Sequence, residues 1–166
     1  MKTQDIIASF NHLATEIGTL LGQQRMKLAV AESCTGGWIA QVITSAPGSS
    51  AWFERGFVTY SNEAKQDLVG VQLRSLEREG AVSQRVVREM AEGALRNSLA
   101  EVSIAVSGIA GPGGGTPDKP VGTVWLGWAA LEKETRTLCQ HFKGDREAIR
   151  AQTVQVALEQ LKDFMK

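Results

Sequence analysis

The sequence predicts an α/β protein: a three-layer α/β/α sandwich with a mixed, mainly parallel sheet. Two observations lead to this class. Apolar runs suited to buried strands alternate with amphipathic helical stretches through the first two-thirds of the chain, and a hairpin followed by a helix closes it. With 166 residues, no linker and no internal repeat, the chain is expected to form one domain over residues 1–166.

The first half of the chain begins with an amphipathic helix predicted over residues 5–22. A short apolar run at Lys27–Ala31 predicts a buried strand, and helical spacing resumes over Trp38–Ser45. A second strand is predicted at Phe57–Tyr60, followed by a helix over Asn62–Val69.

In the second half, Ser83 is the expected N-cap of a helix that runs to Leu99. Val102–Val106 predicts a third strand. Val121–Leu131 and Thr135–Phe142 predict an antiparallel hairpin that turns near residues 132–134. Asp145 is then expected to cap the last helix.

Composition excludes several classes of protein. The 18 basic and 18 acidic residues cancel, which argues against a partner bound mainly by bulk charge, such as nucleic acid or an anionic membrane. Two cysteines and two histidines leave little for a disulfide scaffold or a transition-metal site, so no metal and no cofactor is expected. No apolar run approaches the length of a membrane helix, and a soluble, cytoplasmic protein is expected. Glycine is the one unusual figure, at 17 residues.

A first candidate segment follows the Lys27–Ala31 strand. Ser33 lies at a predicted strand-to-helix turn and could act as a nucleophile, with oxyanion donors among the backbone amides of Thr35, Gly36 and Gly37. The alternative is that Ser33 or Thr35 only caps the helix. Cys34 is a second possible nucleophile, although no activating base lies near it in the sequence.

A second segment holds Tyr60, the only tyrosine, and Lys65 about one helical turn into the next helix. A desolvated lysine can act as a general base, and a tyrosine hydroxyl can relay or orient a proton. The alternative is a solvated surface lysine.

A third segment, after the Val102–Val106 strand, is a glycine-rich loop whose amides could approach an anion such as a phosphate closely. It matches neither the P-loop nor the Gly-x-Gly-x-x-Gly pattern, and a flexible structural turn is the alternative. The candidate ligand-binding residues here are Ser107, Gly108, Gly111, Gly113 and Gly114. The carboxyl ends of neighbouring strands meet at one edge of an open sheet, so all three segments could share one crevice.

Three strings together resemble the CinA C-terminal domain family: residues 31–37 (AESCTGG), 56–65 (GFVTYSNEAK) and 107–112 (SGIAGP). Residues 80–83 (GAVS) and 119–124 (KPVGTV) fit as well, and the resemblance runs from about residue 8 to residue 162.

The resemblance implies hydrolysis of the carboxamide of nicotinamide mononucleotide to nicotinate mononucleotide and ammonia, a step of pyridine nucleotide (NAD) recycling. It also implies a serine amidase with Ser33 as the nucleophile and Lys65 and Tyr60 as its partners. Some members carry a further N-terminal pyrophosphatase-type domain, which is not expected here. A catalytically silent nucleotide-binding or regulatory module of the competence and damage-inducible type is the alternative function. A homodimer is expected.

Overall fold

The computed structural model describes all 166 residues and contains one five-stranded sheet in the order β2-β1-β3-β4-β5. β1 pairs in parallel with β2 and β3, whereas β4 runs antiparallel to both β3 and β5, so four of the five strands point the same way. The strands are β1 (Leu28–Glu32), β2 (Phe53–Val58), β3 (Val102–Gly108), β4 (Thr123–Ala130) and β5 (Lys133–His141). The predicted α/β class and mixed sheet are confirmed.

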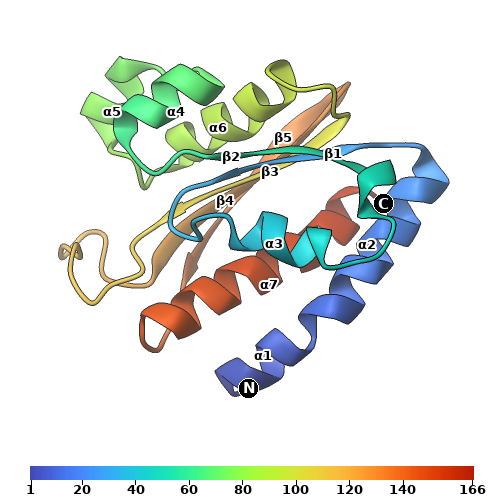
Figure 1. The fold of residues 1–166 in the computed structure, drawn as a ribbon. Helices are drawn as coiled ribbons and strands as arrows, with labels where there is room; N and C mark the ends of the chain where they lie inside the picture. Colours follow the sequence, from blue (N-terminus) through green and yellow to red (C-terminus); the bar gives the residue numbers. More distant parts are fainter.

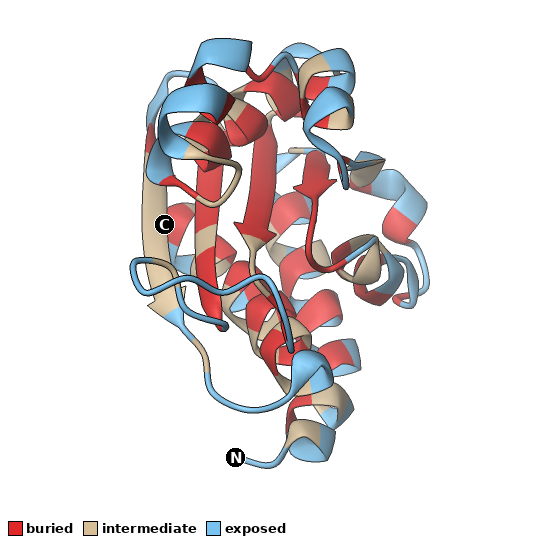
Figure 2. Ribbon diagram, turned by 90° about the vertical axis from the view of Figure 1, so that its left-hand side faces the viewer, coloured by how far each residue is buried: buried red, intermediate tan, exposed pale blue.

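Helices cover both faces of the sheet (Figure 1). One face packs against α1 (Thr3–Ala8), α2 (Phe10–Gln24), α3 (Trp38–Thr44) and α7 (Arg146–Phe164). The other packs against α4 (Asn62–Val69), α5 (Leu73–Glu79) and α6 (Gln84–Arg96). β1 and β3 are buried on both sides, while the edge strand β5 is mostly half-buried (Figure 2). None of the helices combines the length and the apolar composition of a membrane-spanning segment.

Side-chain caps set the starts of three helices. The Oγ of Ser83 accepts from the amide of Val86 at 3.3 Å, and the Oδ1 of Asp145 accepts from the amide of Ala148 at 2.9 Å. Both caps were predicted from the sequence. Ser61 caps α4 in the same way, and Gly70 ends that helix in the left-handed region at φ +69°.

Three local predictions differ from the structure. The helix expected over residues 5–22 is two helices that meet at Ser9, and the apolar stripe continues across the break, which hides it from a periodicity search. The second strand is Phe53–Val58 rather than Phe57–Tyr60. It is an edge strand that carries Glu54 and Arg55, so it lacks an apolar run. Helix α5 and the 3₁₀ turn at Ser49–Ala51 were not predicted, since these short segments are mostly polar.

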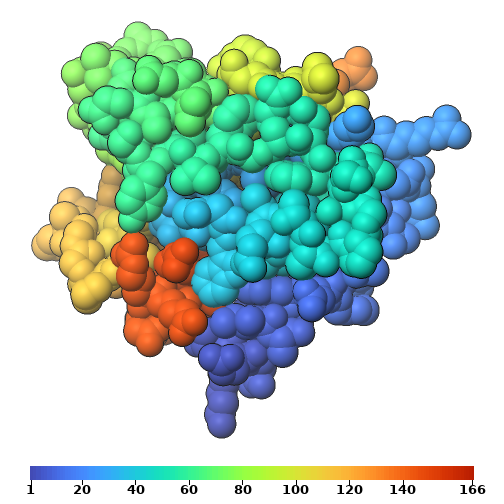
Figure 3. Space-filling model, viewed as in Figure 1, coloured from blue at the N-terminus to red at the C-terminus, as the bar shows by residue number.

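The topology brings distant segments to one edge of the sheet. The parallel strands β1, β2 and β3 all end there, at Glu32, Val58 and Gly108. β4 begins at the same edge because it runs antiparallel to β3. The N-terminal end of α7, orange in Figure 3, lies beside the segment that follows β2. The three polar segments singled out in the sequence therefore meet.

Candidate active site

Ser33 and Lys65 are in direct contact at the end of β1. The Nζ of Lys65 lies 3.0 Å from the Oγ of Ser33 and donates to the carbonyl oxygen of Thr59 at 2.8 Å. The two side chains come from different segments: Ser33 follows β1, and Lys65 lies in the first turn of α4. A hydroxyl within hydrogen-bond distance of an amine is the arrangement that nucleophile activation requires.

Lys65 is held in a nearly dry position. Its exposed fraction is 2%, and no ion pair in the protein includes it. Burial lowers the pKa of Lys65 below its ordinary value of 10.5, and the neighbouring Cys34 has a smaller, opposite effect. The neutral amine, which can accept a proton, is therefore favoured more than it would be for a solvated lysine.

A buried carboxylate shapes the turn that carries Ser33. Glu32 accepts from the hydroxyl of Thr35 at 2.6 Å and from the amides of Ile39 and Ala40 at 2.8 and 3.0 Å. It therefore satisfies the free N–H groups at the start of α3. Burial raises the pKa of Glu32, and these hydrogen bonds act against that rise.

Cys34 is not poised to act as a nucleophile. Its thiol is buried in the apolar core, and that burial raises the pKa of Cys34 to about 12. The thiolate, which is the reactive form, is therefore nearly absent at neutral pH. Of the two nucleophiles that the sequence left open, Ser33 has the better environment.

A cavity of about 220 Å³ opens onto Ser33 and Lys65. Its lining includes Tyr60, Asn62 and Arg146. Tyr60 is 62% exposed, and its hydroxyl accepts from the guanidinium of Arg146 at 3.2 Å. Arg146 also donates to the carbonyl of Gly111 at 2.8 Å, so it ties the glycine-rich loop to the wall of the cavity.

The glycine-rich loop contributes unevenly to this cavity. Ser107 and Gly108 line it, and the Ser107 hydroxyl donates to the carbonyl of Ala81 at 2.8 Å. Gly111 does not line the cavity, but its carbonyl accepts from Arg146, which does. Gly113 and Gly114 are exposed and do not line the cavity. The backbone amides of Gly111, Gly113 and Gly114 donate no hydrogen bond within the protein.

Thr35, Gly36 and Gly37 lie on a different hollow. They line a neighbouring cavity of about 440 Å³ with Trp38 and Arg150, not the one that contains Lys65. The Thr35 hydroxyl is bound to Glu32, and the Gly36 amide donates to the carbonyl of Ser33 at 3.0 Å. The structure thus brings Ser33, Lys65, Tyr60, Ser107 and Gly108 together around one cavity. Thr35, Gly36 and Gly37 lie beside this group, on the neighbouring cavity.

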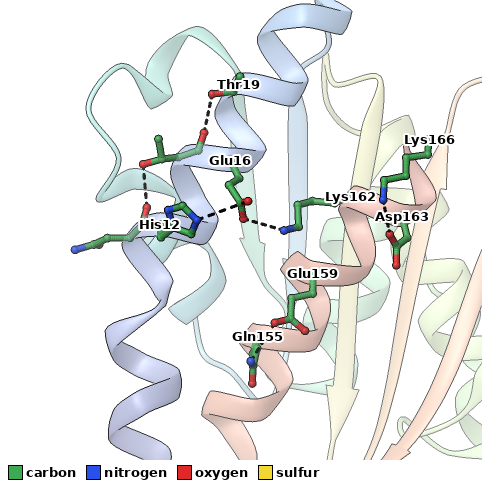
Figure 4. A network of polar contacts seen from close by, with 10 residues as sticks. His12, Glu16, Thr19, Gln155, Glu159, Lys162, Asp163 and Lys166 are labelled. Carbon is green, nitrogen blue, oxygen red and sulfur yellow. Dashed lines mark hydrogen bonds and ion pairs between the residues drawn. The ribbon is translucent and has the colours of Figure 1, made fainter.

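Neither histidine lies near Ser33. His12 is on the outer face of α2, where its ring is 3.7 Å from Glu16, and Glu16 in turn pairs with Lys162 of α7 at 2.8 Å (Figure 4). His141 ends β5 and contacts Thr123. No group of three or more His, Cys, Asp or Glu side chains is placed as a metal site would require.

Two arginines of α7 also belong to the site. From the sequence, Arg146 was only an open candidate for a phosphate contact, with Arg55, and Arg150 was not a candidate. Arg146 reaches Tyr60, and Arg150 donates to the carbonyls of Cys34 and Thr35 at 3.1 and 2.9 Å. Both sit in the first two turns of a helix whose Asp145 cap was predicted, at the edge where the strands end. Their place just after the predicted cap of this helix is the one feature of the sequence that could have identified them.

The sequence profile of the CinA C-terminal domain matches residues 10–165. The chain belongs to the CinA C-terminal domain family. It is 52% identical over 157 residues to the nicotinamide-nucleotide amidohydrolase PncC of Enterobacter agglomerans, which covers 94% of this chain and 96% of that protein. It is also 52% identical over 149 residues to PncC of Escherichia coli K12, with 90% of each chain covered.

Solved structures of the family share the fold. The competence/damage inducible protein CihA from Agrobacterium tumefaciens superimposes with a TM-score of 0.93 at 43% identity, covering 95% of this chain and 96% of that one. A CinA superfamily protein from Escherichia coli gives a TM-score of 0.90 at 39% identity, covering 93% and 90%. The predicted family membership is confirmed.

Proposed function

We propose that this chain hydrolyses the carboxamide of nicotinamide mononucleotide to nicotinate mononucleotide and ammonia. The contact between Ser33 and the buried, unpaired Lys65 carries the proposal. The names of its PncC relatives, which match nearly end to end, supply the substrate class. A serine paired with a neutral amine is suited to acyl transfer from an amide.

In the proposed mechanism Lys65 takes the proton of Ser33 as the Oγ attacks the carboxamide carbon. The carbon–nitrogen bond of the tetrahedral intermediate then breaks, and the Lys65 ammonium returns its proton to the departing nitrogen, which leaves as ammonia. Water attacks the resulting ester by the same route, giving the carboxylate and regenerating Ser33. Because Nζ is already 3.0 Å from Oγ, the first transfer needs no relay.

Tyr60 and Arg146 are assigned to the nucleotide rather than to that first proton transfer. Both line the cavity, and their mutual hydrogen bond orients the phenol at its mouth. This assignment differs from the catalytic partnership with Ser33 and Lys65 that the family resemblance implies for Tyr60.

The glycine-rich loop is assigned to the ribose phosphate. The amides of Ala110, Gly111 and Gly113–Gly115 donate no hydrogen bond in the protein, and free N–H groups of this kind bind anions. Arg146 adds a positive charge where the loop meets the cavity.

The test is to incubate the protein with nicotinamide mononucleotide and measure ammonia and nicotinate mononucleotide together. Ser33→Ala should abolish both products and keep the fold. Ser103→Ala is the matched control, because Ser103 is also a buried serine and its hydroxyl donates only to the carbonyl of Ala91. Near-normal turnover by Ser33→Ala would exclude this nucleophile.

Two other outcomes identify other functions. Binding of the nucleotide without ammonia release would indicate the silent nucleotide-binding module. Faster turnover of free nicotinamide than of the nucleotide would indicate an amidase for a related pyridine compound.

The biological setting stays a prediction: a place in NAD recycling, a cytoplasmic location and a homodimer that binds no nucleic acid. Sedimentation of the purified chain measures the oligomeric state directly.

A further inference from the structure

Most amides near Ser33 are already engaged. The Gly36 amide donates to the carbonyl of Ser33, and the Trp38 amide donates to the carbonyl of Thr35. The amides of Ile39 and Ala40 donate to Glu32. None of these is free to receive the negative oxygen that develops when Ser33 attacks an amide.

The Cys34 amide donates to no carbonyl oxygen of the protein, and Cys34 lines the cavity beside Ser33. In a trans peptide the N–H points opposite to the carbonyl of the same unit. The carbonyl of that unit belongs to Ser33 and faces Gly36, so the Cys34 N–H faces away from Gly36.

The Gly108 amide is free for a reason set by strand register. The last bond between β1 and β3 runs from the Ser33 amide to the carbonyl of Val106, at 3.1 Å. Ile109 then donates to Thr123 of the β4 side at 2.9 Å. Since successive amides of a strand point to opposite sides, the Gly108 N–H points toward the end of β1.

Gly108 also has no room for a side chain. A Cβ there would come within 2.6 Å of Val124. Gly108 itself lines the cavity that contains Ser33.

We propose that the backbone N–H groups of Cys34 and Gly108 form the oxyanion hole for the tetrahedral intermediate at Ser33, and that Arg150 holds the Cys34 side of it in place. This inference rests on the proposed function. It moves the donors from Thr35–Gly37, where the sequence put them, to the amides of two residues that line the same cavity as the nucleophile.

Arg150 is a positioning residue because it contacts the turn and not the cavity of Ser33. Its guanidinium donates to the carbonyl of Cys34 at 3.1 Å and of Thr35 at 2.9 Å, and it stacks over Trp38 at 5.3 Å. Two donors on successive carbonyls fix the backbone immediately after the Cys34 amide.

The test compares Arg150→Met with a matched control, Arg136→Met. Arg136 is likewise half-buried, stacks over a tryptophan (Trp128, 5.1 Å) and donates to a backbone carbonyl (Gln160, 2.8 Å), but it lies on β5 away from the site. The substrates are nicotinamide mononucleotide and its thioamide analogue, in which sulfur replaces the carboxamide oxygen.

We expect kcat of Arg150→Met for the amide to fall roughly 10- to 100-fold, less than the 10²–10³-fold typical of deleting one oxyanion donor. KM and the pH midpoint of kcat should stay unchanged, and the amide-to-thioamide ratio of kcat should fall, since a misplaced hole loses its preference for oxygen. Arg136→Met should keep the wild-type kcat and ratio. Arg150→Lys, which retains a single donor group, should give an intermediate kcat and serves if the methionine variant does not fold.

Each contrary result is distinct. A kcat within twofold of wild type overturns the inference, as does a fall in kcat with an unchanged amide-to-thioamide ratio or a rise in KM alone. Absence of ammonia release by the wild-type protein would overturn the proposed function as well, whereas wild-type turnover with an unaffected Arg150→Met variant would overturn only this inference.

Discussion

Replacing Lys65 by methionine should remove one contribution to the pH dependence of the free energy of unfolding, the one that comes from the titration of Lys65. Burial holds the pKa of Lys65 below its ordinary value of 10.5, which it regains in the unfolded chain. Between these two values the unfolded chain binds one more proton than the folded protein. The contribution of Lys65 to the free energy of unfolding therefore rises with pH between these two pKa values and is constant below the lower one.

The slope can be worked out from the one group. With Lys65 neutral in the folded protein and charged in the unfolded chain, the free energy of unfolding of the wild type should gain up to about 1.4 kcal/mol per pH unit relative to Lys65→Met. Any constant loss from the unpaired Thr59 carbonyl in the variant shifts the difference without changing its slope. Contributions from all other titrating groups cancel in the difference.

Urea unfolding of both proteins at several pH values between about 6 and 10 measures this difference in the free energy of unfolding. This range lies below the ordinary pKa of lysine, where a lowered pKa of Lys65 has its effect. The same variant should lose about 10²–10⁴-fold in kcat, the usual contribution of a general base. A difference in stability that stays flat over the whole range would refute the reasoning. It would mean that Lys65 keeps its ordinary pKa in the folded protein and is charged at neutral pH.

Four further substitutions test the rest of the site. Glu32→Gln, which puts an amide NH₂ group among three donors, should lower the free energy of unfolding by about 1–3 kcal/mol and reduce kcat, as measured by urea unfolding and ammonia release. Arg146→Ala should raise KM more than it lowers kcat; a change in kcat alone would contradict a role in binding. Gly108→Ala should impair both stability and turnover through its clash with Val124, and adding Val124→Ala should restore much of the stability. Cys34→Ala should keep turnover within a few-fold, and complete loss would revive the thiol as a nucleophile.

Much of the architecture could be predicted because it is encoded locally. The apolar runs of β1 and β3, the cap at Ser83 and the cap at Asp145 are short-range signals, and each lies where it was expected. The edge strand β2 was misplaced because one of its faces meets solvent and its sequence resembles a loop.

The candidate site was only partly predictable for a different reason. Ser33 and Lys65 are 32 positions apart, and the spacing of Lys65 on its helix is equally suited to a surface lysine. Its burial depends on how α4 packs over the strand ends, which no local pattern contains. The family resemblance made Ser33 the leading candidate for the nucleophile and Lys65 for its partner. The contact between them agrees with that assignment.

The amides after Ser33 show the limit of reasoning from one motif. A serine before Thr35-Gly36-Gly37 at a strand-to-helix turn suggests oxyanion donors at the helix start. However, Glu32 stands one position before the nucleophile, and its carboxylate takes the Thr35 hydroxyl as well as the amides of Ile39 and Ala40, which follow in α3. An acidic residue at the end of a buried strand needs such donors, so its presence already competes with that assignment.

The same engagement of Glu32 explains how Lys65 avoids an ion pair with a nearby buried acid. Glu32 and Lys65 both lie at the carboxyl edge of the sheet, and each is almost fully buried. An ion pair between them would hold Lys65 protonated and unable to accept from Ser33. Instead the carboxylate is bound by Thr35 and by the start of α3, and the amine contacts only Ser33 and Thr59. A buried lysine without an acidic partner lowers stability, so its retention next to a serine is better explained by chemistry than by folding.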